Sequence, residues 1–211
     1  MENKRKMLIE SLKILILKKG YSNTTIDDIT KEANISKGSF YTYFKNKDEL
    51  LEEILSNKME SIKKENEKIL KEDFTLDAVI ENFLISKIKE RGFDIKTEVV
   101  VMNILQNLDV LSPTTKKFLL ERDQINIKFF QDIFIKYSKF IKIELKDVIN
   151  HAKIIDCIIN HFKINKFYVT IDVNEGFSFE NNIDAIKEKM NSSETDSSIE
   201  FLKKIILKIL T

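Results

Sequence analysis

The chain of 211 residues has little of what interrupts helices, because it contains one proline and four glycines. Their scarcity argues against a turn-dense β architecture and favours long helices. A single cysteine, Cys157, excludes an intramolecular disulfide and is typical of a reducing cytoplasm. No apolar stretch approaches the roughly 20 residues that a membrane-spanning helix needs, so we expect a cytoplasmic protein without a membrane partner.

Net charge is nearly absent as well, with 35 Lys and Arg against 34 Asp and Glu. The distribution is uneven, since residues 1–47 contain ten basic and five acidic residues. A basic end on a balanced chain is typical of contact with a polyanion at that end. Patterns that carry catalysis are missing: there is no glycine-rich phosphate loop and no nucleophile elbow, and Cys157 with His161 lacks further ligands for a metal site. We therefore expect no enzyme, no cofactor and no metal.

Residues 24–51 predict two short helices joined by a tight turn, followed by a third helix. A threonine at position 24 or 25 can cap the first helix, because its side-chain oxygen accepts from free N–H groups of the first turn. Asn34 follows that helix, and asparagine tolerates the left-handed backbone that ends a helix. Ser36 can cap the second helix, whose inward side is formed by Phe40 and Phe44.

The outward side of the second helix carries a cation, a hydroxyl and phenols, a set that stability alone explains poorly. It is typical of a helix in the major groove of DNA, where side chains meet base edges and phosphates. The residues on this side are Lys37, Gly38, Ser39, Tyr41 and Tyr43.

These residues resemble the DNA-binding domain of the TetR family of bacterial transcriptional regulators, over about Met7 to Leu51. The match includes the Gly20-Tyr21 break, the Thr24-Thr25-Ile26 entry, the run ISKGSFY at 35–41, and Lys47 before Glu49-Leu50-Leu51. Family members mostly carry glycine where Asn34 lies, and both residues accept the turn. The resemblance implies DNA contacts from Thr25, Ser36, Lys37, Gly38, Ser39, Tyr41, Tyr43 and Lys47.

The same resemblance implies an all-α fold with a helix-turn-helix DNA-binding head at residues 1–50. Residues 51–211 would then form a helical effector-binding and dimerisation domain. We expect a ligand-responsive regulator, in the form of a repressor, that binds a palindromic double-stranded DNA operator as a homodimer and is released by a small, apolar effector. The alternative is a DNA-binding regulator without a small ligand, controlled by a protein partner or by oxidation of Cys157.

Base recognition is expected to be modest. Arg5 is the only arginine of residues 1–50, so bidentate recognition of guanine by arginine would have to come from a mobile N-terminal arm. DNA shape and contacts with thymine methyl groups would supply the rest.

Two later segments carry apolar residues at heptad spacing, which is typical of paired helices. In the resembled family such helices form a four-helix bundle between subunits. The other interpretation is that both stripes face the core of their own subunit. The residues are Leu145, Val148, Ala152, Ile155 and Ile159 in the first segment, and Ile199, Leu202, Ile206 and Ile209 in the second.

Fifteen phenylalanines could line an apolar cavity between helices, as the family resemblance implies, although any single phenylalanine is more often ordinary core. The candidates for effector contact are Phe83, Met102, Phe118, Phe130, Phe134 and Phe162.

Residues 166–179 do not fit a helical pattern. Phe167, Val169, Ile171 and Val173 alternate with other residues, which is the periodicity of a strand. A short hairpin or an extended loop is expected there, with no assigned role.

Overall fold

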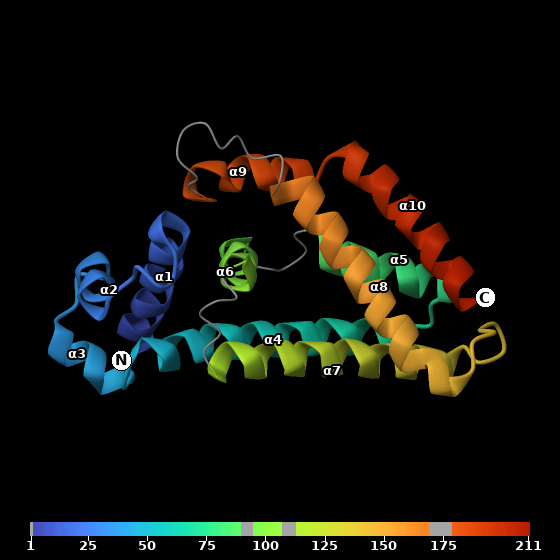
Figure 1. Cartoon of the computed structure of the whole chain (residues 1–211), viewed down its shortest axis with the longest axis horizontal. Helices are drawn as coiled ribbons and strands as arrows, with labels where there is room; N and C mark the ends of the chain where they lie inside the picture. Colours follow the sequence, from blue (N-terminus) through green and yellow to red (C-terminus); the bar gives the residue numbers. More distant parts are fainter. Residues whose placement is uncertain (1, 90–94, 107–112, 169–178) are drawn as a thin grey trace. The chain divides into compact units, whose positions relative to one another are not determined.

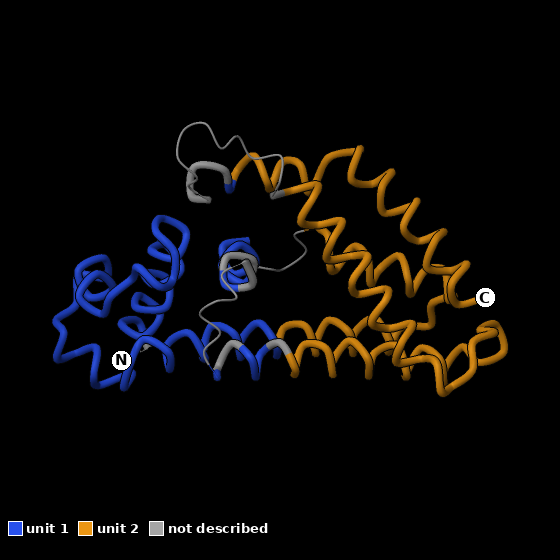
Figure 2. The backbone as a smooth tube through the Cα atoms, viewed as in Figure 1, with its two compact units in different colours: residues 1–60, 93–119, 173–183 blue, residues 61–92, 120–172, 184–211 orange. Residues whose placement is uncertain are grey.

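The computed structural model describes residues 2–89, 95–106, 113–168 and 179–211. Within these ranges the chain is helical and contains no strand, which confirms the predicted all-α fold. The chain forms two compact units, coloured separately in Figure 2. Unit 1 comprises residues 1–60, 93–119 and 173–183, and unit 2 comprises residues 61–92, 120–172 and 184–211. The boundary at residue 50, which separates the expected DNA-binding head from the expected effector-binding domain, stays a prediction.

In unit 1 the first helix, α1 (Glu2–Lys19), is buried along one side. It contacts α2 (Ile26–Glu32) and α6 (Ile95–Gln106) (Figure 1). The sequence places its apolar residues three, four or one positions apart, which brings them to one face of a helix. The buried residues include Leu8, Leu12, Leu15 and Ile16.

The helix α4 (Lys47–Lys71) is continuous, and its residues belong to unit 1 up to Glu60 and to unit 2 from Ser61. Its inward stripe repeats at spacings of four and three, as expected for an amphipathic helix. One member of the stripe is polar, and it is buried like its apolar neighbours. The stripe consists of Leu55, Met59, Ile62, Asn66 and Ile69.

In unit 2, α5 (Leu76–Ile88) lies along α10 (Ser193–Leu210) (Figure 1). Both helices begin at a capping hydroxyl, since the side chain of Thr75 accepts from the N–H of Ala78 and Ser192 accepts from that of Thr195. Lys203 of α10 is buried and lies 2.9 Å from a carboxylate oxygen of Glu81 on α5.

The core of unit 2 is built where α5 meets α7 (Pro113–Lys136). The rings of Phe83 and Phe129 stack with centroids 4.6 Å apart, and Phe130 packs edge-on against both. Pro113 is the first residue of α7, a position that suits proline because its missing N–H would have no partner within the helix.

The helix α8 (Val148–Lys163) buries the stripe that was a candidate dimer interface. Four of its five candidates have exposed fractions of 2% or less within the subunit, because α8 contacts α5 and α10. In α10, Ile199, Leu202 and Ile206 are buried too, and Ile209 is half-buried. Leu145, just before α8, is exposed. These stripes therefore face the subunit's own core, the interpretation that the sequence left open.

The start of the predicted hairpin is helical rather than extended. Residues Ile164–Tyr168 form a π-helical turn (η3) that follows α8 directly. Phe167 is buried there, with its ring edge-on to that of Phe162 at 6.1 Å. Burial of this ring overrides the strand-like alternation. Residues 169–178 lie outside the described residues, and α9 (Phe179–Met190) begins at Phe179.

No helix within the described ranges combines the length and the apolar composition needed to cross a membrane.

Candidate nucleic-acid interface

The helix α2 begins with a capping box formed by Thr25 and Asp28. The hydroxyl of Thr25 accepts from the N–H of Asp28 at 3.2 Å, and the carboxylate of Asp28 accepts from the N–H of Thr25 at 2.8 Å. The ammonium of Lys19 lies 2.7 Å from the same carboxylate. The hydrogen bonds from Lys19 and then from Thr25 hold the pKa of Asp28 well below its usual range. The hydroxyl of Thr25 is thus used in the cap, although the residue is exposed.

The turn between α2 and α3 (Lys37–Tyr43) passes through Asn34, whose φ is 52°. This is the left-handed region predicted from the asparagine. Asn34 donates its N–H to the carbonyl of Lys31, and Ile35 donates to that of Thr30. The chain thereby leaves α2 and enters α3 within four residues, Ala33 to Ser36.

The helix α3 has an inward aromatic side and an outward polar side. Ser36 caps it by accepting from the N–H of Ser39 at 3.2 Å. Phe40 and Phe44 are fully or almost fully buried, with ring centroids 5.9 Å apart. The outward residues are exposed or half-buried, so none of these candidates is used in the core. They are Ser36, Lys37, Gly38, Ser39, Tyr41 and Tyr43.

The cation at the start of α3 has a partner within the chain. The ammonium of Lys37 lies 2.7 Å from a carboxylate oxygen of Asp27 on α2, and both side chains are exposed. The hydrogen bond with Asp27 raises the pKa of Lys37. An exposed pair of this kind contributes little to stability. A phosphate can therefore compete with Asp27 for Lys37 at small cost.

Gly38 leaves the surface of α3 open. A Cβ atom placed on it would meet no heavy atom within 4 Å. The glycine therefore is not needed for packing within the chain, and its backbone is accessible to an approaching partner.

Lys47 holds the base of the three-helix unit together. Its ammonium donates to the carbonyls of Tyr21 at 2.8 Å and Thr24 at 2.7 Å, and it lies 4.1 Å from the centroid of the Tyr21 ring. Burial lowers its pKa. Two of the three ammonium protons are thus used by the fold, and the expected phosphate contact stays a prediction.

Arg5 belongs to α1 and not to a free arm. Its guanidinium donates to both carboxylate oxygens of Glu53 on α4, with Nε at 2.9 Å from each, and lies 5.2 Å from the centroid of the Phe44 ring. The hydrogen bond that Arg5 donates to Glu53 raises the pKa of Arg5. The outward side chains of α3 are therefore left as the candidates for base contacts.

The six candidates for effector contact are divided between the two units, and their role stays a prediction. Phe83 and Phe130 are packed in the ring cluster of unit 2, and Phe118 is buried in unit 1. Phe134 is half-buried, and Phe162 borders a groove on α8. The side chain of Met102 lies outside the described part of the chain.

Cys157 is exposed on α8 and borders the same groove as His161. The Nε2 atom of His161 lies 2.9 Å from the side-chain nitrogen of Asn165. Among the described residues, no three His, Cys, Asp or Glu side chains are grouped as a metal site.

The sequence profile described as bacterial regulatory proteins, tetR family, matches residues 8–54, which include the capping box, the turn and α3. HTH-type transcriptional regulator YhgD of Bacillus subtilis, whose description marks it as uncharacterized, is 24% identical over 175 residues, 80% of this chain and 82% of that protein. The negative regulator IcaR of the Staphylococcus epidermidis biofilm operon icaADBC is 40% identical over 50 residues, 24% of this chain and 27% of that protein.

A solved structure of PfmR, a TetR family transcriptional regulator from Thermus thermophilus, superposes with a TM-score of 0.60. The two sequences are 19% identical, and the match covers 89% of this chain and 95% of that one. At this identity the likeness shows the fold alone. The all-α fold, the capped helices α2 and α3 and the match to the sequence profile together identify a DNA-binding transcriptional regulator. Residues 8–54 match the DNA-binding domain of the TetR family, and the described part of the chain shares the fold of solved TetR-family regulators.

Proposed function

We propose that this regulator is a repressor that binds a palindromic operator as a homodimer, with one α3 in each of two successive major grooves. Grooves on one side of the duplex recur about every 34–36 Å, which sets the spacing of the two half-sites. The observation that carries the proposal is the polar outward side of α3, anchored by buried Phe40 and Phe44. IcaR, which is a negative transcriptional regulator, favours repression as the mode of action.

The roles of the outward residues follow from their chemistry. Lys37 leaves Asp27 for a phosphate or a guanine, and Gly38 lets the α3 backbone approach the DNA closely. Tyr41, Tyr43, Ser36, Ser39 and Thr25 contact the backbone of the duplex.

The homodimer is proposed to form through exposed apolar residues of α8 and α10 in place of the buried stripes. Ile154 on α8 has an exposed fraction of 51%, and Phe201 on α10 one of 63%. Exposed apolar side chains of this size are typical of a surface covered by a partner. Pairing duplicates α3, which a palindromic operator requires.

A small effector is proposed to release the DNA by favouring subunit conformations whose α3 helices do not match successive grooves. The direct test is selection of bound duplexes from a random-sequence pool, followed by footprinting with and without cell extract. A protected palindrome that the extract releases is expected. Protection of a single asymmetric half-site, or no selected sequence, would contradict the proposal.

The alternative is control by oxidation of Cys157, and it is supported by the exposure of the Cys157 thiol. In that case an oxidant releases the DNA without any small ligand. Release from wild type but not from Cys157→Ser would favour this alternative, whereas equal release from both would reject it.

A further inference from the structure

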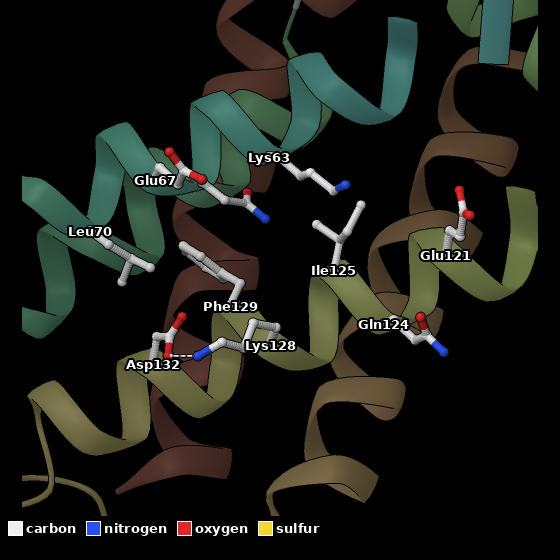
Figure 3. Close-up of a pocket in the computed structure, with 10 residues that line it drawn as sticks. Lys63, Glu67, Leu70, Glu121, Gln124, Ile125, Lys128, Phe129 and Asp132 are labelled. Atoms are coloured by element: carbon white, nitrogen blue, oxygen red, sulfur yellow. Dashed lines mark hydrogen bonds and ion pairs between the residues drawn. The ribbon is translucent and has the colours of Figure 1, made fainter. Parts of the chain in front are cut away.

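A groove lies between α4 and α7 within unit 2, with a volume of about 490 Å³ (Figure 3). Figure 3 shows Ile125 and Phe129 projecting from α7 towards α4, and Leu70 on the α4 side. At its end the two helices are tied, because the ammonium of Lys136 donates to the carbonyls of Leu70 at 2.8 Å and Glu72 at 2.7 Å. The volume lies within the range of small-molecule sites.

The side chain that distinguishes this groove is Asn66 of α4. Its exposed fraction is 5%, and among the described residues no protein atom pairs with its Nδ2 or its Oδ1. A buried amide without partners carries the desolvation penalty of both groups. Such a residue on the apolar stripe of a helix reduces the stability of the fold, and it therefore needs an explanation outside the fold.

A second buried asparagine shows how this subunit satisfies an amide from within the fold. Asn126 of α7 has an exposed fraction of 3%. Its Oδ1 accepts from Lys87 at 3.1 Å, and its Nδ2 donates to Asp156 at 2.7 Å. Asn126 borders a different groove, beside α8, but its amide is paired at both ends by neighbouring helices, whereas the amide of Asn66 has no partner among the described residues.

The charges around the groove favour a neutral occupant. Two lysines and three carboxylates border it, and Lys128 already pairs with Asp132, as the dashed line in Figure 3 marks. The cations therefore do not outnumber the anions, so a carboxylate or phosphate ligand gains no net attraction. The bordering charged residues are Lys63, Glu67, Glu121, Lys128 and Asp132. All except Asp132 are exposed, so their long side chains can move to admit a ligand.

We propose that this groove binds a neutral, flat ring compound that carries a hydrogen-bond donor beside an acceptor, as in a lactam or an aromatic carboxamide. The ligand N–H donates to Oδ1 of Asn66, and its carbonyl accepts from Nδ2, which satisfies both orphaned groups at once. Its ring lies against Ile125, Phe129 and Leu70. The role of this ligand as the effector rests on the proposed function, but the site does not.

The test uses three neutral probes on the full-length protein: quinolin-2(1H)-one, isoquinolin-1(2H)-one and 2-naphthamide. Quinoline, which lacks the donor and the carbonyl, and 2-naphthoate, which is an anion, serve as comparison compounds. The chain contains no tryptophan, so binding can be followed by the fluorescence of the compounds. At least one neutral probe should bind at least tenfold more tightly than quinoline and 2-naphthoate.

The variant Asn66→Leu should weaken binding of that probe at least tenfold and raise the Tm of the free protein, because it removes an unpaired buried amide. Asn126→Leu is the matched control: it should lower the Tm, since it breaks a satisfied network, and leave probe affinity unchanged. Absence of binding by all three neutral probes overturns the proposal. Equal affinity in Asn66→Leu, or tighter Asn66-dependent binding of 2-naphthoate, overturns it as well.

Addition of the bound probe to the operator complex tests the proposed function separately. If the probe binds through Asn66 but the DNA stays bound, the groove is a ligand site and its effector role fails. If another compound releases the DNA in Asn66→Leu as in wild type, the repressor function stands and this groove is not its effector site.

Discussion

Two glycines of unit 1 differ in what a methyl group would do to them. Gly38 lies in α3 with open space where a Cβ would stand, whereas Gly20 ends the α1 segment with a φ of 80°. A left-handed backbone costs an L-residue about 1–2 kcal/mol, and an ordinary helical position carries no such cost. Gly20 is thus required by the backbone, and Gly38 is not required by anything within the chain.

Gly38→Ala should therefore leave stability equal or raise it by up to about 1 kcal/mol, because alanine favours the helix. Operator affinity should fall at least tenfold, or about 1.4 kcal/mol, since the methyl group would lie between α3 and the DNA. Thermal unfolding and fluorescence anisotropy with labelled operator measure the two effects. Gly20→Ala is the control, with lower stability expected. Unchanged affinity in Gly38→Ala would remove α3 from close contact with DNA.

Lys47→Ala should destabilise the protein by about 1–3 kcal/mol, because the carbonyls of Tyr21 and Thr24 lose their donor. Lys47 thus has a structural role in addition to the DNA contact that the family resemblance implies. Chemical denaturation followed by circular dichroism gives the loss, with exposed Lys45→Ala as the control. If stability were unchanged while the salt dependence of operator binding flattened, Lys47 would be a phosphate contact alone.

At the scale of the element, α2 depends on a carboxylate whose ionisation the cap stabilises. The folded pKa of Asp28 lies below the value of about 3.9 of an unfolded chain. The unfolded chain therefore binds the proton first as the pH falls. The stabilisation is fully present above pH about 3.9 and is lost as the pH falls towards the folded pKa.

Asp28→Asn should reduce stability near neutral pH and flatten the loss of stability below pH about 4. Thermal unfolding at a series of acidic pH values compares it with wild type. Asp27→Asn is the matched control, because Asp27 pairs with Lys37 on the surface and takes no part in the capping box. The same acid dependence in Asp28→Asn as in wild type would refute a role for this carboxylate.

The sequence predicted the elements that rest on local chemistry. The caps at Thr25 and Ser36, the left-handed Asn34 and the inward aromatic pair of α3 are all set by residues a few positions apart. Apolar residues at heptad spacing, in contrast, predict that one face of a helix is buried but not which element covers it. The stripe on α8 was therefore compatible with the core of the subunit and with a dimer interface. Its burial against α5 and α10 depends on residues far away in the sequence.

Two other features depended on tertiary contacts. The ammonium of Lys47 meets carbonyls 23 and 26 residues earlier, which no local pattern indicates. Asn66 could be noticed in the sequence, because it is a polar residue at a position where the helical spacing of α4 predicts an apolar one. The unpaired state of its amide becomes evident only once its neighbours are known.

At the scale of the whole molecule, the proposed homodimer would duplicate α3 by pairing through the exposed apolar residues of α8 and α10. Phe201 has an exposed fraction of 63%, close to the 65% of Phe140, which lies outside both helices. Because their exposure is similar, Phe140 is a matched control for Phe201: a charged side chain at either position would be solvated in the single subunit.

Phe201→Glu should convert the dimer to a monomer and abolish tight operator binding, because burial of a carboxylate in an apolar interface is unfavourable. Phe140→Glu should leave both unchanged. Sedimentation equilibrium gives the mass, and gel shifts give the affinity. A dimeric Phe201→Glu would place the interface elsewhere.

The uninterrupted course of α4 from Lys47 to Lys71 limits how its sequence can change in length. Each residue of an α-helix turns the chain by about 100°, so a single insertion between Ile62 and Asn66 would rotate Asn66 and every later side chain by that angle relative to the earlier part of the stripe. Asn66 would then no longer lie on the buried stripe of α4, whereas the helix caps and α3 would be unchanged. Insertions and deletions are consequently expected in the loops of related chains and not in the part of α4 that carries Asn66.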